Sequence, residues 1–313
     1  MSDVIRETAA RCQNWGKWGS DDERGTLNYI TAEHIAHAAS LVKRGVVFSL
    51  AVPFNLKGPQ RADSPRRFNP IHRMMLTGVD FVSGGMTMPG GVGFADDMII
   101  MPLQCGTQWD ALSHCFLDGK LYNGYDAGEI TSQGAKRNSI EKIANGVVGR
   151  GVLLDMPRAR GVSWLDPGYA ITSEDLEQAL AAHNVQVGTG DILLVRTGQL
   201  AMVRHRGAWG DYAGGDAPGL SFYTADWIHQ RQIAAVATDT WGMEVRPNEI
   251  ANSYQPLHQV FIPSMGLTIG EIFDLEELAS DCAVDGVYEF FFTAPSLPFT
   301  GAVGCPTNPL AIK

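Results

Sequence analysis

The sequence lacks the features that mark several broad classes of protein. Its five cysteines are an odd number with no C-x-x-C pair, which argues against a disulfide framework or a cysteine-rich zinc site and indicates free thiols in a reducing cytoplasm. No apolar stretch reaches the roughly 20 residues that a membrane helix needs, and the first residues contain no apolar signal-peptide core. We therefore expect a soluble, cytoplasmic protein with no membrane partner.

Positive charge is also scarce. The chain has 24 Lys and Arg against 34 Asp and Glu, a formal net charge of −10. The one local concentration, residues 61–67, holds three arginines with an aspartate among them and is interpreted as a solvated loop. Because phosphate binding needs a basic face, nucleic acid is excluded as the main partner, and we expect a small-molecule substrate.

What the chain does contain is typical of a globular enzyme: 45% apolar and 19% charged residues over 313 positions, a length that leaves one or two domains open. Its 35 glycines and 16 prolines follow no period, which favours many tight turns between short strands. The glycine cluster at 83–93 does not match G-x-G-x-x-G, so a dinucleotide loop is not expected there.

The local patterns predict more strands than helices. Strands are expected at 47–54, 97–104, 151–156, 191–197, 233–238 and 287–293, and helices at 31–42 and 173–183, capped by Thr31 and Thr172. This mixture predicts an α/β fold with a central mixed β-sheet.

The densest group of polar side chains lies between Pro102 and Phe116. Gln104, Gln108, Asp110 and His114 stand at even separations, so they would share one face of an extended strand. On a straight strand Gln104 and Gln108 would be about 13 Å apart, too far to hold one ion, so the backbone must bend if both contribute. Gly106 can provide that bend through a positive φ. The spacing by itself favours a simpler interpretation, a strand edge whose polar groups face water or cap neighbouring loops.

This segment resembles the signature of the cyclase family, which includes bacterial kynurenine formamidase, isatin hydrolase and trans-dienelactone hydrolase. The family motif reads H-x-G-T-H-x-D-x-x-x-H. Gly106, Thr107, Asp110 and His114 match it, while Gln104 and Gln108 replace its two leading histidines.

Further segments resemble the family in the same order. His258, followed by Glu271 before a Leu-rich stretch, is similar to a second family element, in which the glutamate opens a short helix. Segments 149–155, 190–197 and 237–240 resemble family strands, and 18–28 resembles a longer branch that carries the glutamine variant. The likeness spans roughly 12–305. It implies the swivelling β/β/α cyclase-like fold over 46–313, with 1–45 as an N-terminal extension and helix packed on it, and a homodimer or homotetramer.

The resemblance also implies a site. Gln104, Gln108, Asp110 and His258 would hold a divalent metal, with Glu271 as a further ligand or catalytic residue. Amide oxygens suit harder ions, so Mn²⁺ is favoured over Zn²⁺. Such an ion activates water against a carbonyl, and His114 would be the general acid/base. The expected function is hydrolysis of a small, often cyclic, amide or ester.

Two alternatives stay open: a metal-free member that binds a small ligand, and a cyclase or lyase that uses Asp110 and His114 without water attack.

Other candidates have simpler explanations. Cys105 and Cys115 lie near His114 in sequence, but free cysteines are mostly buried apolar residues. His34 and His37 share a helix face without a third ligand. Trp109 fits either ring stacking or core packing. Asp239 and Glu244 follow a buried strand, where both ligands and turn caps occur. The loops at 56–93 and 205–222 are expected to select the substrate.

Overall fold

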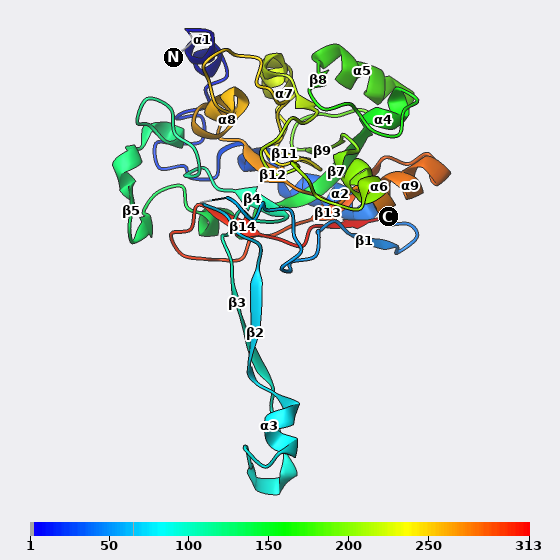
Figure 1. Ribbon diagram of the computed structural model, residues 1–313. Coiled ribbons are helices and arrows are strands. Elements are labelled where there is room, and N and C mark those ends of the chain that lie inside the picture. The colour runs from blue at the N-terminus through cyan, green and yellow to red at the C-terminus, as the bar shows by residue number, and fades with distance from the viewer. Residues whose placement is uncertain (1–2, 65) are drawn as a thin grey trace.

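The computed structural model describes residues 3–64 and 66–313 and is organised around a nine-stranded sheet of order β1-β15-β13-β7-β9-β11-β12-β4-β14 (Figure 1). The strands of this sheet are β1 (Val47–Ser49), β4 (Gln108–Asp110), β7 (Val148–Asp155), β9 (Ile192–Arg196), β11 (Ala235–Thr238), β12 (Thr268–Glu271), β13 (Glu289–Thr293), β14 (Gly304–Pro306) and β15 (Leu310–Ile312). The neighbours β7, β9, β11 and β12 are parallel, and the remaining pairs are antiparallel. The predicted α/β class with a central mixed sheet is confirmed.

The α-helices surround this sheet, apart from α3, which lies on a hairpin that projects from the body. They are α1 (Asp3–Arg11), α2 (Ala32–Ser40), α3 (Gly78–Val82), α4 (Met156–Ala159), α5 (Ser173–Ala182), α6 (Gln199–Arg206), α7 (Ala225–Gln230), α8 (Pro256–Val260) and α9 (Glu276–Asp285). Three two-stranded sheets complete the structure: β2 (Ile71–Leu76) with β3 (Asp96–Ile100), β5 (Ile130–Thr131) with β6 (Gly134–Ala135), and β8 (Ala170–Ile171) with β10 (Gly219–Leu220).

The parallel centre forms where the sequence is continuously apolar. Residues 192–196 and 235–238 are buried throughout, as strands covered on both faces must be. The strands predicted at 151–156, 191–197, 233–238 and 287–293 are therefore confirmed within a few residues. Both predicted helix caps are also confirmed: the Thr31 and Thr172 side chains each accept a hydrogen bond from the backbone three residues on.

Two predicted strands are wrong in part. The strand expected at 47–54 ends at Ser49, with only an isolated bridge at Ala51. The strand expected at 97–104 is β3, which pairs with β2 and lies outside the central sheet. Apolar composition alone does not reveal that this strand is exposed over its whole length.

A large apolar cluster forms the main core of the body, and a smaller separate cluster lies around Leu200, Tyr212 and Ile272. Ile5 of α1 and Leu27 are buried in the same apolar cluster as β7 and β11, so the residues before β1 pack on the main sheet. Close packing at Gly270 of β12 leaves no room for a Cβ, which would lie 2.7 Å from the Trp109 ring and 2.8 Å from Ala237. Glycine is required there because Trp109 fills the space.

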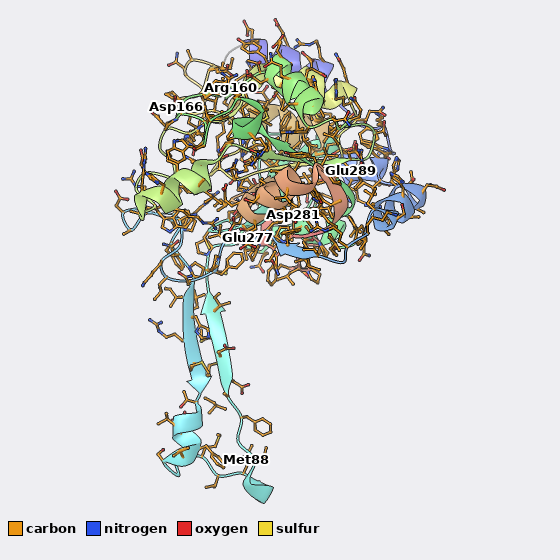
Figure 2. All side chains as sticks on the ribbon, turned by 90° about the vertical axis from the view of Figure 1, so that its right-hand side faces the viewer. Met88, Arg160, Asp166, Glu277, Asp281 and Glu289 are labelled. Atoms are coloured by element: carbon orange, nitrogen blue, oxygen red, sulfur yellow. The ribbon has the colours of Figure 1, made fainter. Side chains whose placement is uncertain are left out.

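A long hairpin, here called the arm (residues 71–100), projects from the body on the side away from α1, α7 and α8 (Figure 1). It consists of β2, α3 and β3, with Met88 labelled near its far end (Figure 2). Among all the described residues, the arm included, no helix is both long and apolar enough to cross a bilayer.

Candidate active site

The site is built on a pair of antiparallel strands at the end of the parallel centre. β4 lies beside β12 in a register that places Gln108 opposite Glu271 and Asp110 opposite Ile269. The Gln108 amide donates to Glu271 Oε2 at 3.0 Å and faces Asp110 Oδ1 at 3.5 Å. Glu271 is the last residue of β12, so the site occupies the carboxyl edge of the sheet, where α/β proteins commonly bind ligands.

His258 reaches the same place from α8. Its Nε2 lies 3.1 Å from Glu271 Oε1, and its Nδ1 lies 2.6 Å from Glu244 Oε1. Glu244 also accepts the backbone N–H groups of Leu257 and His258. The first turn of α8 is therefore anchored on one buried carboxylate, and the imidazole is held with Nε2 toward Glu271.

Asp110, His258 and Glu271 form a buried triad able to hold a cation: one ligand atom from each lies within 4.8 Å of the others. Within residues 3–64 and 66–313, Gln108 Oε1 and Asp110 Oδ2 are buried without a hydrogen-bond partner. Unpartnered buried oxygens are rare because burial without compensation costs free energy. Two of them beside this triad fit a site for a hard divalent cation.

The charges of the triad depend on one another. Burial raises the pKa of Asp110, and the neighbouring carboxylate of Glu271 raises it further. Burial also opposes ionisation of His258, but its hydrogen bonds to Glu244 and Glu271 outweigh that effect and raise its pKa to about 10. The same contact with His258 overcomes burial at Glu271 and lowers the pKa of that carboxyl group. Without a metal, His258 thus carries the positive charge that balances the carboxylates.

His114 stands at the mouth of this buried group. It follows β4 in a turn closed by its backbone N–H to Ala111, and its Nε2 lies 3.9 Å from Asp110 Oδ1. Its side chain is 23% exposed, whereas that of Asp110 is 1% exposed. His114 also lines a cavity of 540 Å³ that opens beside the triad. A half-buried imidazole between a carboxylate and a cavity is suited to move protons to and from a bound molecule.

Gln104 is placed differently from the other predicted ligands. It lies in the turn before β4, where its carbonyl accepts from Arg67 and its amide nitrogen packs on Gly304, the residue opposite Asp110. That amide nitrogen is buried without a partner among the described residues. Its assignment as a ligand stays a prediction.

The structural reasons for two site features differ from those predicted from the sequence. The chain turns before Gln108 and again after Asp110, so neither Gln104 nor His114 lies on an extended strand with Gln108. Gly106 has no positive φ; a Cβ there would lie 2.7 Å from the Phe54 ring, which is why glycine is needed. Glu271 does not open a helix: it ends β12, and α9 begins at Glu276.

The chain turns sharply directly after Glu271. Ile272 has a φ of 61°, unusual for a β-branched residue, and is held by hydrogen bonds to Thr107 and Thr240. Such strain persists only where surrounding contacts enforce it and is common at functional sites.

Glu244 is the residue whose role the sequence left undecided, since ligand and turn cap were both open. Its position after a buried strand was the available signal, and only the contact with His258 gives its role. Trp109 is fully buried against Phe273 and Phe292 and donates to the Ala294 carbonyl, so it belongs to the core.

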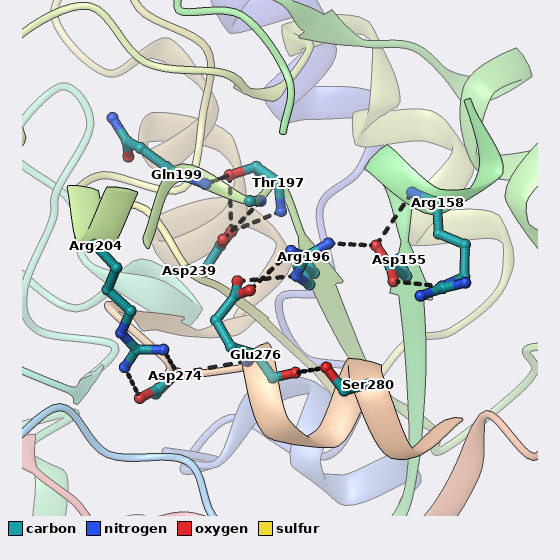
Figure 3. A network of polar contacts seen from close by, with 11 residues as sticks. Asp155, Arg158, Arg196, Thr197, Gln199, Arg204, Asp239, Asp274, Glu276 and Ser280 are labelled. Atoms are coloured by element: carbon teal, nitrogen blue, oxygen red, sulfur yellow. Dashed lines mark hydrogen bonds and ion pairs between the residues drawn. The ribbon is translucent and has the colours of Figure 1, made fainter. Parts of the chain in front are cut away.

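Asp239, the companion candidate, lies in a separate polar network (Figure 3). It accepts from the backbone and hydroxyl of Thr197 and from Gly198 N, and burial raises its pKa to about 6. Beside it, Arg196 joins Asp155 and Glu276. This network fastens the ends of β7, β9 and β11 to α9.

The cysteines near His114 are not poised as nucleophiles. Burial raises the pKa of Cys105 to about 11 and that of Cys115 to about 12. A thiol at such values is not ionised near neutral pH and is a poor nucleophile. All five cysteines are free.

Comparisons with known proteins agree with this architecture. The family model described as Cyclase matches residues 48–245. A crystal structure described as a novel cyclase is 43% identical, covers 97% of this chain and 99% of its own, and superposes with a TM-score of 0.88. No curated protein matches the sequence at a significant level.

More distant structures share the fold. Isatin hydrolase A from Labrenzia aggregata, bound to benzyl benzoate, is 18% identical with a TM-score of 0.60, covering 88% of this chain and 94% of its own. An isatin hydrolase bound to the product analogue thioisatinate is 14% identical with a TM-score of 0.62, covering 90% and 98%. The resemblance predicted from the motif around Asp110 is confirmed, and the chain belongs to the cyclase family.

Proposed function

We propose that this protein is a metal-dependent hydrolase that opens a small amide or ester bond, commonly a cyclic one. The observation that supports this most is the buried triad Asp110, His258 and Glu271, in which Asp110 and the neighbouring Gln108 each have an unpartnered oxygen. His114, next to Asp110, lines a cavity. Carboxylate and amide oxygens outnumber nitrogen in this set, which favours Mn²⁺ over Zn²⁺.

The roles of the residues follow from their positions. Asp110, Glu271, His258 and Gln108 would hold the ion, which supplies Lewis acidity that polarises the scissile carbonyl and eases deprotonation of water. His114 would take the proton from the attacking water and pass it to the leaving nitrogen or oxygen, since it faces both Asp110 and the cavity. Glu244 fixes the tautomer and orientation of His258.

The test combines metal content with chemistry. Protein dialysed against chelator is titrated with Mn²⁺ and assayed on a panel of lactones, cyclic imides and N-formyl anilides, following whether the product gains the mass of one water. We expect Mn²⁺ to restore hydrolysis and His114→Ala to reduce kcat by about 100-fold or more, the usual contribution of general acid/base catalysis. Full activity in His114→Ala would contradict the assigned role, and a product without added water would indicate the cyclase or lyase reaction instead.

A second candidate has one observation in its favour. The amide of Gln108 and the imidazole of His258 already satisfy Glu271, so part of the site is closed by hydrogen bonds without a cation. A metal-free member of the family would then bind a small ligand without hydrolysis. Purified protein without bound metal that also fails to take up Mn²⁺ would favour this function. The five free thiols support a cytoplasmic setting for either candidate.

A further inference from the structure

The cavity that His114 lines is rich in positive charge, although the chain as a whole has a net charge of −10. Arg61, Arg66 and Arg67 line it together with His114 and Trp241. Its volume of 540 Å³ is in the range of small-molecule sites. A basic cavity in an acidic protein concentrates anions locally and repels them elsewhere.

These arginines differ in whether a carboxylate of the protein already pairs with them. Arg61 is paired with Asp63 at 2.8 Å. Arg67 donates one N–H to the Gln104 carbonyl at 3.2 Å and lies over the Trp241 ring at 5.4 Å. Within the described chain, neither Arg66 nor Arg67 has a carboxylate partner. Arg67 therefore has donors available for a ligand.

A second guanidinium group, that of Arg246, lies over the Trp241 ring. Arg246 lies 5.2 Å from the ring centroid and donates to the Gly214 carbonyl at 2.7 Å. Arg246 Nη1 and Trp241 Nε1 are both buried without an acceptor among the described residues. Both of these unsatisfied groups are hydrogen-bond donors, so a ligand that satisfies them would have to supply acceptors.

We infer that the substrate is an anion, a planar molecule with a carboxylate that is held by Arg67 beside Trp241 while its scissile bond lies toward Asp110 and His114. Guanidinium groups bind carboxylates through paired, charge-assisted hydrogen bonds, and the indole face suits a flat ring. This inference rests on the proposed function for the position of the scissile bond. The anion site itself requires only the residues of the cavity.

The test measures binding without turnover. Chelator-treated protein is titrated with benzoate and with benzamide, which has the same shape and no charge. We expect benzoate to bind about tenfold or more tightly, as hydrogen bonds to charged groups predict, and Arg67→Gln to abolish that preference while Arg67→Lys retains part of it. Arg73→Gln, on the exposed arm, is the matched control and should behave as wild type.

The outcomes separate the two proposals. Equal binding of both probes, or an unchanged preference in Arg67→Gln, would overturn the anion site even if hydrolysis is observed. A benzoate preference that depends on Arg67, in a protein that hydrolyses nothing, would support the anion site and contradict the proposed function.

Discussion

Glu244→Gln tests how the site is organised while changing only one atom of the side chain. The carboxylate accepts three hydrogen bonds, from Leu257 N at 2.9 Å, His258 N at 3.1 Å and His258 Nδ1 at 2.6 Å. Its side chain is 2% exposed, so water cannot replace these contacts. Glutamine keeps one acceptor oxygen and turns an NH₂ group toward donors that the other oxygen had satisfied.

The expected effects follow from those contacts. At least one buried N–H loses its acceptor, which costs about 1–3 kcal/mol of unfolding free energy. His258 also loses the partner that orients its ring, and loss of such a partner typically weakens metal binding by about 10- to 100-fold. Stability and Mn²⁺ affinity should therefore both fall.

Urea unfolding and Mn²⁺ titration of the same preparations measure the two effects. Glu249→Gln is the control, because Glu249 also accepts a backbone N–H and a hydroxyl, from Phe222 and Ser221, but is not among the contacts of His258. We expect it to bind Mn²⁺ as wild type does. If Glu244→Gln loses stability yet retains wild-type Mn²⁺ affinity, Glu244 is only a helix anchor, and its orienting role is refuted.

Three further predictions concern stability. Arg196→Ala should lower the unfolding free energy by about 3–5 kcal/mol, because it leaves buried Asp155 without its 2.7 Å partner (Figure 3). Arg204→Ala breaks a more exposed pair with Asp274 and should cost less than about 1 kcal/mol, so equal losses in urea unfolding would contradict this reasoning. Gly270→Ala should destabilise by about 1–3 kcal/mol through overpacking against Trp109, while Gly188→Ala, whose Cβ meets nothing within 4 Å, should not lower the thermal midpoint. In metal-free protein, His258 has a folded pKa of about 10, against roughly 6.5 when unfolded. Its contribution to stability is therefore complete below pH ~6.5 and is lost as the pH rises toward 10. The urea midpoint of wild type should fall over this pH window, and that of His258→Gln should depend less on pH.

The local patterns predicted the buried centre of the fold well. Continuous apolar runs identified β7, β9 and β11, because strands covered on both faces need apolar side chains throughout. The aromatic run at 287–293 identified β13, in which buried and half-buried residues alternate. At β3 the local patterns predicted a strand but not its exposure on the arm. The apolar composition of a segment indicates that it can form a strand, but it does not show whether that strand is buried in the folded chain.

The site shows the same division. The polar group at Gln108, Asp110 and His114 is legible in sequence because its residues are close together and because it resembles a family motif. Its partners lie far away in the sequence: Glu271, which only the family resemblance predicted, is 163 residues from Gln108 and joins it through strand register, and Glu244 reaches His258 because a turn and α8 bring them together.

The sequence by itself therefore determined the fold class, the family and the segment that carries the chemistry, because these depend on local periodicity and on a short motif. Only the tertiary structure decided which carboxylates face His258, which arginines surround Trp241 and that residues 71–100 leave the body. Those properties depend on contacts between distant segments, and side-chain type does not specify such contacts.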